Sequence, residues 1–377
     1  MRIVIGQTGA PTTVVDETLR GLMHGLQGHE AFAARGGPDG LVAGALERLT
    51  QEDLPPAGAR GGSWLGGGRR ATTADDVRDI VLGLAERGVH ALALIGGNGT
   101  MALLDAVASC ASELGTGLRV VGVPKTVDND LVHTDHAPGF ASAARYLASV
   151  VPDLARDQHA MQGVEPVRVV ETLGRAVGWL ALAATWHRED PQHAPDLVLI
   201  PELTVERDAL LAGVDAVLAR RGRAFLVVSE GVRVDEAGEP FRSSNHATLL
   251  HGGVARTLAS TITAGLGVPA RGEVLGMVQR SASGLASAAD VREASAVGRA
   301  AAGLLVGRPD HSLDLEAGMD AVMVTTVRDP GPSYAVHHGT VPLADVAGRD
   351  RPVPKEWQTN EPSDLDDFHT WLAPLIA

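Results

Sequence analysis

The segment PKTVDND, residues 124–130, places one lysine, one threonine and two aspartates directly after an apolar run. Transfer of a phosphoryl group to an alcohol needs a carboxylate that takes the hydroxyl proton, a cation that offsets phosphate charge and often a carboxylate that holds Mg²⁺. Asp128 and Asp130 point to the same side if the segment is extended, so one can act as the base while the other orients it. Thr126 can donate to a phosphate oxygen, and Lys125 can neutralise its charge.

Two other interpretations of this segment stay open on the residues alone. It could be a solvated acidic turn, or it could be a metal site, because the continuation DNDLVHTDH adds His133, Asp135 and His136 to the two aspartates. The glycine-rich turns elsewhere in the chain favour the catalytic interpretation.

Three glycine-rich turns are suited to binding phosphate. In QTGAPTT an anion can approach the backbone at Gly9, and a helix beginning near Thr12 or Thr13 would point its free N–H groups at that anion. In GGGRR the turn delivers two arginines, the first of them Arg69, and in GGNGT the turn precedes a helix that Thr100 opens. Each turn alone could be only a tight connection, but three together favour phosphate. None has the spacing of a P-loop or of the dinucleotide fingerprint.

Seven apolar runs rich in β-branched residues position these turns. They are RIVIG at 2–6, ALALIGG at 91–97, LRVVGV at 118–123, VRVVETLG at 167–174, DLVLIPE at 196–202, AFLVVSEG at 224–231 and EVLGMVQR at 273–280. Their alternation with stretches of helical pattern predicts an α/β protein with mainly parallel sheets. In such sheets ligands bind outside the carboxyl ends of the strands, where these polar clusters lie.

Composition and charge limit the size of the domains, the location of the protein and the partners that it can bind. A chain of 377 residues is long enough for two domains, and no apolar run approaches the length of a membrane helix. The first residues lack the pattern of a secretion signal, and a single cysteine, Cys110, lies at a core position of a predicted helix. We therefore expect a cytoplasmic protein. The formal net charge of -14 works against binding to nucleic acid or to an anionic membrane.

The motifs together resemble the phosphofructokinase family. The match runs in order through GQTGAPTTVVDETLRG, LGGGRR, IGGNGT, VGVPKTVDNDL, TDHAPGF, ETLGRAVGWLA, LIPE, VVSEGV and EVLGMVQR. The resemblance implies the phosphofructokinase fold, with two Rossmann-like domains of three layers each. Residues 1–140 with 280–328 would bind the phosphoryl donor, and residues 141–279 with 329–377 would bind the sugar phosphate.

The resemblance also implies an activity and a set of catalytic residues. The reaction would move a phosphoryl group from ATP or pyrophosphate to a sugar phosphate, most simply from fructose 6-phosphate to fructose 1,6-bisphosphate in glycolysis. Asp128 would be the general base, Asp130 would hold it, and Thr126 would steady the phosphoryl group, with Lys125 and Arg175 completing the catalytic set. The donor-phosphate site would comprise Gly9, Arg69, Gly97, Asn98, Gly99 and Thr100, and Mg²⁺ would be held by Asn98 and Asp128.

On the acceptor side the resemblance assigns sugar contacts to Gly174, Arg175 and Glu230. Arg271 and Arg280 would grip the phosphate of the acceptor, with Arg271 reaching across from a neighbouring subunit. The resemblance therefore implies a homodimer or a homotetramer.

Two positions bear on the choice of donor. In this family, glycine at the place of Gly99 goes with ATP, whereas lysine at the place of Lys125 occurs in pyrophosphate enzymes and in one ATP branch. We therefore favour ATP and keep pyrophosphate as the alternative. Asn98 stands where ATP enzymes have an aspartate that organises Mg²⁺; its amide oxygen can still bind a hard cation, but without the charge.

More departures fall on the acceptor side. Leu173 replaces a methionine, Val177 replaces a smaller residue, and Met277 replaces a histidine that helps to bind the 6-phosphate. A phosphate-binding arginine aligns with Pro166, although Arg168 follows two residues later. Losing such a partner to a phosphate costs about 1.5 to 3 kcal/mol.

Two hypotheses therefore remain for the function. The protein is a kinase for fructose 6-phosphate or for another sugar or sugar phosphate, or it is a sugar-phosphate binding protein that has lost catalysis. The kinase is favoured because a binding protein needs no base, and the chain retains Asp128, Asp130, Thr126, Arg175 and Arg280.

Overall fold

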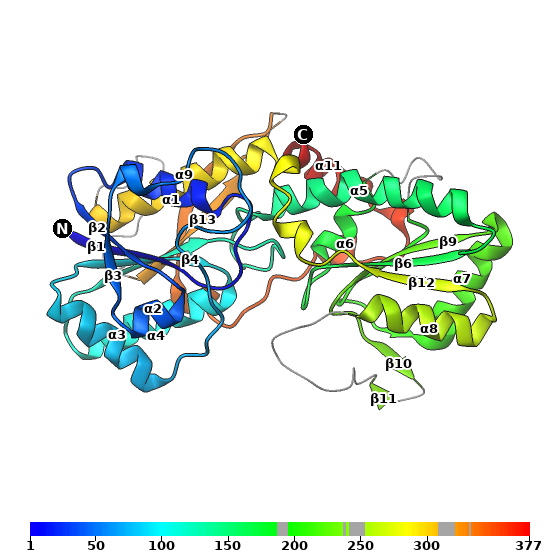
Figure 1. Ribbon diagram of the computed structural model, residues 1–377, viewed down its shortest axis with the longest axis horizontal. Coiled ribbons are helices and arrows are strands. Elements are labelled where there is room, and N and C mark those ends of the chain that lie inside the picture. The colour runs from blue at the N-terminus through cyan, green and yellow to red at the C-terminus, as the bar shows by residue number, and fades with distance from the viewer. Residues whose placement is uncertain (187–194, 237–238, 241–252, 308–320, 332) are drawn as a thin grey trace. The chain divides into compact units, whose positions relative to one another are not determined.

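The computed structural model describes residues 1–186, 195–236, 239–240, 253–307, 321–331 and 333–377 (Figure 1). The chain forms two compact units. Unit 1 comprises Met1–Ser142 and Arg280–Asp350, and unit 2 comprises Ala143–Gln279 and Arg351–Ala377. None of the helices in the described ranges has the length and apolar character that a membrane span requires.

Unit 1 is built on a seven-stranded sheet whose central pairs are parallel. In spatial order its strands are β14 (Val336–Pro342), β13 (Ala321–Arg328), β5 (Arg119–Pro124), β4 (Ala91–Gly96), β1 (Arg2–Gln7), β2 (Glu30–Ala34) and β3 (Leu46–Leu49). Only the two edge pairs, β13 with β14 and β2 with β3, are antiparallel. After β1 the chain builds β2 and β3 on one side and then returns to β4 on the other, so the order reverses between β1 and β4. Ligands of open α/β sheets bind at such reversals.

Helices cover both faces of this sheet (Figure 1). One face carries α1 (Val15–Gly25) and α9 (Ala288–Val306); the other carries α2 (Pro38–Val42), α3 (Ala74–Glu86), α4 (Asn98–Glu113) and α10 (Leu343–Val346). Two short 3-10 helices, η1 (Gln51–Asp53) and η3 (Ser283–Leu285), lie in connections. Helices α1 and α9 approach so closely that a Cβ on Gly21 would lie 2.0 Å from the Ser295 carbonyl oxygen.

Unit 2 contains a parallel sheet in the order β12 (Ala270–Val274), β6 (Val167–Thr172), β9 (Ala224–Ser229) and β7 (Leu197–Leu199). Helices α7 (Arg207–Arg221) and α8 (Val254–Leu266) pack on one face, and α5 (Phe140–Met161) and α6 (Trp179–Ala183) lie on the other (Figure 1). A small sheet joins β8 (Val205–Glu206), β10 (Val234–Glu236) and β11 (Glu239–Pro240). The remaining elements are η2 (Gly276–Arg280), η4 (Lys355–Trp357), η5 (Pro362–Asp364) and α11 (Asp366–Ile376).

The α/β prediction is confirmed, with helices on both faces of mainly parallel sheets, but three local expectations are wrong or incomplete. The strand expected at 273–280 lies at Ala270–Val274, and Gly276 ends the extended backbone with a φ of 59°. Residues 329–350 belong to unit 1 instead of unit 2, because β14 pairs with β13. Cys110, on α4, is only partly buried and packs against the edge of the core.

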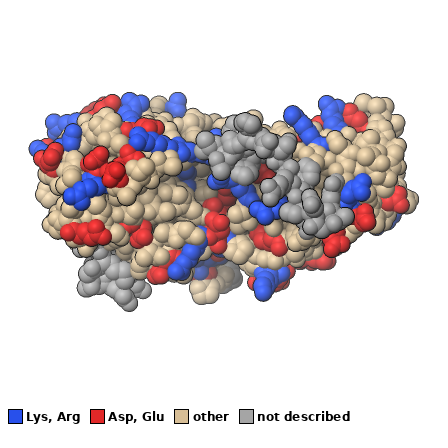
Figure 2. Space-filling view, turned by 90° about the horizontal axis from the view of Figure 1, so that it is seen from below, with Lys and Arg blue, Asp and Glu red and all other residues tan. Residues whose placement is uncertain are grey.

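The charged residues are spread over the surface. On the face shown in Figure 2, lysine and arginine side chains lie interspersed with aspartate and glutamate in the described part of each unit. The net charge of -14 is therefore not gathered into a single patch on that face.

Candidate active site

Three loops meet at the carboxyl ends of β1, β4 and β5, which are neighbours in the sheet of unit 1. The Thr8 amide donates to the Ile95 carbonyl at 3.0 Å, and the Lys125 amide donates to the Gly96 carbonyl at 3.0 Å. The Gly9 amide donates to the Gly68 carbonyl at 2.8 Å, so the arginine-bearing turn joins the same edge. All three glycine-rich turns predicted to bind phosphate thus lie together with the aspartate segment.

The glycines of these turns differ in what they are needed for. A Cβ on Gly67 would lie 2.4 Å from the Gly9 carbonyl oxygen, so this glycine allows two backbones to approach closely. Gly9 itself has a φ of 76°, which favours glycine. A Cβ on Gly99 would meet no atom within 4 Å. Packing against the described residues therefore does not explain the glycine at position 99.

Helix α4 presents its N-terminus to the loop that follows β4. It begins at Asn98 with Gly97 as N-cap, so Thr100 lies inside the first turn and does not open the helix as expected. The Thr100 hydroxyl hydrogen-bonds to the hydroxyl of Thr8. Free amides at the start of a helix and its positive dipole end favour an anion. Helix α1 begins at Val15, later than Thr12 or Thr13, and both threonines are buried.

Lys125 is buried, with 4% of its surface exposed, and it ties the loops together. Its Nζ donates to the Ala10 carbonyl at 2.6 Å and to the Thr8 carbonyl at 3.3 Å. Burial lowers the pKa of Lys125 to about 8; the nearby charges of Asp130 and Asp128 oppose the shift, and those of Arg280 and Arg69 add to it. Four charged side chains that were predicted to belong to the active site therefore lie near one buried lysine. They are Asp128, Asp130, Arg69 and Arg280.

Arg70, the second arginine of the GGGRR turn, is held away from this group. Its guanidinium pairs with Asp76 at 2.7 Å and with Asp39 at 3.3 Å. Of the two arginines in this turn, Arg69 is the one whose charge lowers the pKa of Lys125.

The aspartate segment is bent, so the expectation of an extended chain is wrong. Asn129 is fully buried with a φ of 57°, and its Oδ1 accepts a hydrogen bond from the Ala137 amide at 3.1 Å. The Asp128 amide donates to Thr126 Oγ1 at 3.1 Å. Asp128 and Asp130 are half-buried on either side of Asn129. A side-chain hydrogen bond, instead of strand geometry, therefore sets their positions.

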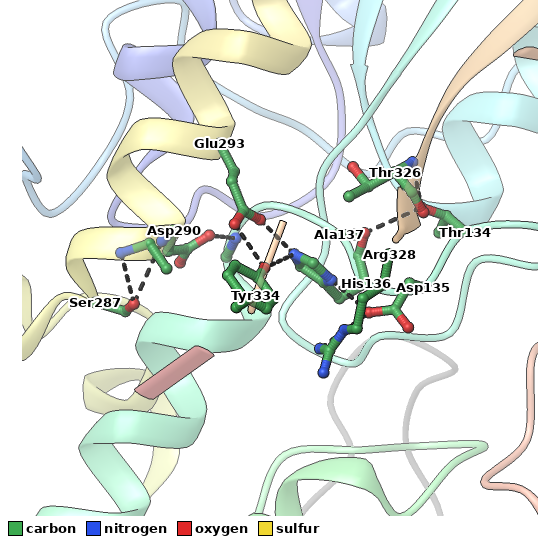
Figure 3. A network of polar contacts seen from close by, with 12 residues as sticks. Thr134, Asp135, His136, Ala137, Ser287, Asp290, Glu293, Thr326, Arg328 and Tyr334 are labelled. Carbon is green, nitrogen blue, oxygen red and sulfur yellow. Dashed lines mark hydrogen bonds and ion pairs between the residues drawn. The ribbon is translucent and has the colours of Figure 1, made fainter. Parts of the chain in front are cut away.

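A buried network fixes the far end of this loop (Figure 3). His136 lies between Asp135, 2.8 Å from its Nδ1, and Glu293 of α9, which its Nε2 contacts. The Tyr334 hydroxyl donates to Glu293 at 2.6 Å. Burial disfavours the charged imidazole, but the hydrogen bonds to Asp135 and Glu293 and the charges of these two carboxylates together outweigh it and raise the pKa of His136 to about 9. His136 is therefore a buried cation between two carboxylates.

Asp290, one turn before Glu293 on α9, supports the same loop. Its carboxylate accepts hydrogen bonds from the Gly139 amide at 2.9 Å and the Ser142 amide at 3.0 Å. Burial raises the pKa of Asp290, and these hydrogen bonds oppose that shift. Helix α9 thus anchors the chain that leaves the aspartate segment.

The interpretation of this segment as a site of three or more histidine and acidic ligands is not supported. No such group of metal-ligating side chains occurs among the described residues. His136 is occupied by Asp135 and Glu293, and His133 is exposed, with a φ of 62°.

Asn98 has the features of a ligand for a hard cation. Its Nδ2 donates to Asp350 Oδ1 at 2.7 Å and to Asp130 Oδ2 at 3.1 Å. Its Oδ1 is buried and has no hydrogen-bond partner in the described part of the chain. Buried polar atoms are nearly always satisfied, and Mg²⁺ binds through oxygen. The donor set therefore fits the Mg²⁺ that the resemblance implies.

In unit 2 the predicted sugar-contacting residues follow β6 and β9. Gly174 has a φ of 124°, and a Cβ there would lie 2.5 Å from Ser229 Oγ. The Glu230 amide donates to the Thr172 carbonyl at 2.9 Å, and Arg175 is exposed. Adjacent strand ends thus bring Gly174, Arg175 and Glu230 together.

The predicted phosphate-binding arginines do not gather at that edge. Arg271 lies near the amino end of β12, where it pairs with Glu165 and with Glu273. Arg168 has only 3% of its side chain exposed and pairs with Asp157 at 2.7 Å and Glu165 at 2.9 Å. The Arg168 guanidinium is thus held by acidic partners. It is not placed to substitute for the phosphate-binding arginine that Pro166 replaces.

Arg280 belongs to unit 1, where its charge acts on Lys125. Leu173 and Val177 are buried, whereas 49% of the Met277 surface is exposed.

Sequence reasoning missed Asp350 and Glu293. They lie far along the chain from the aspartate segment, and neither belongs to a recognisable motif. Only the pairing of Leu131 with Asp350 and the packing of α9 bring them to this site.

Comparisons with known proteins agree with this geometry. The sequence profile of the family described as Phosphofructokinase matches residues 2–305. A sulfofructose kinase of Alkalicoccus urumqiensis is 34% identical over 100% of this chain and 96% of that relative. A pyrophosphate–fructose 6-phosphate 1-phosphotransferase of Rhodospirillum rubrum is 31% identical over 100% of this chain and 94% of that relative.

A solved structure shows the same fold. The pyrophosphate-dependent phosphofructokinase of Nitrosospira multiformis has a TM-score of 0.83 at 27% identity, over 100% of this chain and 91% of that one. The chain belongs to the phosphofructokinase family, and it is a phosphotransferase.

Proposed function

We propose that this enzyme transfers the terminal phosphoryl group of ATP to a hydroxyl of a ketose whose far end carries a sulfonate. In this reaction Asp128 takes the proton of the hydroxyl, the hydroxyl oxygen bonds to phosphorus, and the bond from phosphorus to the departing ADP oxygen breaks. Fructose 6-phosphate is the second candidate acceptor.

The observation that carries the proposal is the loss of phosphate-binding groups on the acceptor side. Pro166 and Met277 stand where the family has an arginine and a histidine, and Arg168 is held by Asp157 and Glu165. A phosphate monoester carries nearly two negative charges at neutral pH, whereas a sulfonate carries one. A site with fewer cations therefore suits the sulfonate better.

The similarity to a sulfofructose kinase over the full chain supports this choice of acceptor. The relatives named for fructose 6-phosphate support the second candidate.

ATP is the proposed donor because the space beside Gly99 is open: a Cβ built there would meet no atom within 4 Å. This space leaves room beside the first turn of α4 for a donor larger than pyrophosphate. Pyrophosphate is the second candidate, favoured by Lys125. Because Nζ of Lys125 already donates to two backbone carbonyls, we assign this lysine to holding the donor loops.

Asn98 and Asp128 are proposed to hold Mg²⁺, which offsets the negative charge of the donor phosphates when it is bound. The residues proposed to receive the donor phosphates are Gly9, Arg69, Gly97, Gly99 and Thr100. Thr126 is proposed to donate to the transferring group, and Asp130 to hold Asp128 in place.

We further propose a homodimer or homotetramer in which Arg271 serves the acceptor site of a neighbouring subunit. Its place near the amino end of β12, away from Gly174 and Glu230, supports this assignment.

The test is phosphoryl transfer followed by phosphorus NMR. The purified enzyme is given Mg²⁺, either ATP or pyrophosphate, and one of three acceptors: 6-deoxy-6-sulfofructose, fructose 6-phosphate or fructose. We expect the highest kcat/KM with ATP and the sulfonate, and no turnover in Asp128→Asn. A higher kcat/KM for fructose 6-phosphate would refute the sulfonate proposal. Binding of an acceptor without transfer from either donor would instead indicate a binding protein.

A further inference from the structure

The orientation of the Asn98 amide is decided by the atoms around its nitrogen. Nδ2 lies 2.7 Å from Asp350 Oδ1, 3.1 Å from Asp130 Oδ2 and 3.2 Å from the Asp130 carbonyl oxygen. All three neighbours are acceptors, and an ionised carboxylate has no proton to donate. The amide nitrogen must therefore face them, and Oδ1 must face the other way, where it is buried without a hydrogen-bond partner in the described residues.

We propose that Asp350 is a positioning residue for the divalent cation that binds with the donor phosphates. Asp350 holds Nδ2 of Asn98 so that Oδ1 is presented to the cation, and it supplies the negative charge that residue 98 lacks. This inference rests on the proposed function of Asn98 as a Mg²⁺ ligand.

Charge repulsion explains why residue 98 is an amide. An aspartate at position 98 would place its carboxylate within hydrogen-bond distance of the carboxylates of Asp130 and Asp350. Like charges at that distance repel strongly when no cation is bound. Asparagine at 98 with aspartate at 350 keeps the negative charge beside the site and removes the clash.

The backbone fixes Asp350 in this place. Asp350 pairs with Leu131 in an antiparallel bridge, and Leu131 directly follows Asp130 and is fully buried. The side chain of Asp350 is exposed, as is that of a typical surface carboxylate. Its contact with Asn98 is nevertheless fixed by this backbone pairing with the residue that follows the aspartate segment.

The test compares four variants: Asp350→Asn, Asn98→Asp, the charge-swapped double variant that carries both changes, and Asp79→Asn as control. Asp79 is an exposed carboxylate of α3, so the control removes the same charge from another surface of unit 1. Mn²⁺ serves as the probe. Its dissociation constant is measured by electron paramagnetic resonance with ATP present, and then with pyrophosphate, always without acceptor.

We expect Asp350→Asn to weaken Mn²⁺ binding about tenfold, because the charge is lost and residue 350 can then donate to Oδ1. Its unfolding midpoint in urea should match that of Asp79→Asn. The double variant should return to within about threefold of the wild type, since the total charge is restored. Asn98→Asp alone should bind Mn²⁺ at least as tightly as the wild type.

Two outcomes would overturn the inference: Mn²⁺ affinity of Asp350→Asn equal to that of the control, or a double variant as weak as Asp350→Asn. Because no acceptor is present, an error in the proposed acceptor does not affect the result. A wild-type enzyme that binds no Mn²⁺ with either donor would overturn both this inference and the proposed cation site.

Discussion

Replacing His136 with glutamine should make the stability of the enzyme less dependent on pH. In the wild type the imidazole is buried between Asp135 and Glu293, and Glu293 also accepts a hydrogen bond from Tyr334. Burial raises the pKa of Glu293, but the hydrogen bond and charge of His136, the hydrogen bond from Tyr334 and the charge of His338 together outweigh it, so the net pKa is lowered. Both partners therefore favour a charged imidazole. Glutamine keeps a donor at this position but removes the charge.

The magnitude follows from the pKa of His136, which rises from 6.5 to about 9 on folding. One pKa unit corresponds to about 1.4 kcal/mol, so the charged imidazole contributes about 3 kcal/mol to the free energy of unfolding. Because the pKa is higher in the folded state, this contribution is complete below pH 6.5. It is lost as the pH rises through about 9. Among the described residues, Tyr334, His338 and Arg328, which pairs with Asp135, also lie near His136.

Urea unfolding followed by circular dichroism at pH values from 6 to 10 measures the effect. We expect the wild type to be more stable than His136→Gln by about 3 kcal/mol near pH 6, with the difference approaching zero near pH 10. His24→Gln, a change of an exposed histidine on α1, should leave the pH profile unchanged. A difference between wild type and His136→Gln that stays constant over this range would refute the assignment of a buried cation.

Three further predictions concern packing, donor choice and assembly. Gly21→Ala should destabilise the fold by about 1 to 3 kcal/mol in urea unfolding, because its Cβ would meet a carbonyl of α9 at 2.0 Å. Gly83→Ala on α3, where a Cβ would approach only the guanidinium of Arg87, at 3.3 Å, should not destabilise it, and equal losses in both variants would contradict the packing argument. Gly99→Asp should lower kcat/KM for ATP at least about tenfold in a coupled assay, through repulsion between the carboxylate and the donor phosphates, without moving the unfolding midpoint. Mixing the inactive variants Asp128→Asn and Arg271→Ala should restore about a quarter of wild-type activity if half of the dimers are hybrids with one intact site each; no recovery would refute the role of Arg271 across subunits.

The sequence was sufficient to group the residues of the proposed donor site. The turns at Gly9 and Asn98 and the aspartate segment each follow a strand, and parallel order places these strand ends on one edge, so Gly9, Asn98 and Asp128 could be grouped before the fold was known. The bend at Asn129 could not be foreseen, because it depends on a hydrogen bond to the Ala137 amide. Asp350 and Glu293 were also beyond reach, since long-range packing alone brings them to the loop.

The acceptor side shows the same limit. The sequence shows only that Arg168 lies two residues after Pro166, so Arg168 was a candidate substitute for the arginine that is missing there. The structure gives it three acidic neighbours: Asp157, Glu165 and Glu273. Whether an arginine is available to a ligand depends on its partners, and residue spacing carries no information on these.

The three acidic neighbours of Arg168 also affect how the preference for a substrate could change during evolution. A mutation of Pro166 to arginine would place a new guanidinium next to Glu165, which already pairs with both Arg168 and Arg271. That carboxylate would compete with a substrate phosphate for the new cation. Under the proposed function, a change to a strongly phosphate-selective enzyme would therefore require at least one acidic residue to be lost as well as a basic one gained. Such paired requirements slow adaptation, because neither change alone improves binding.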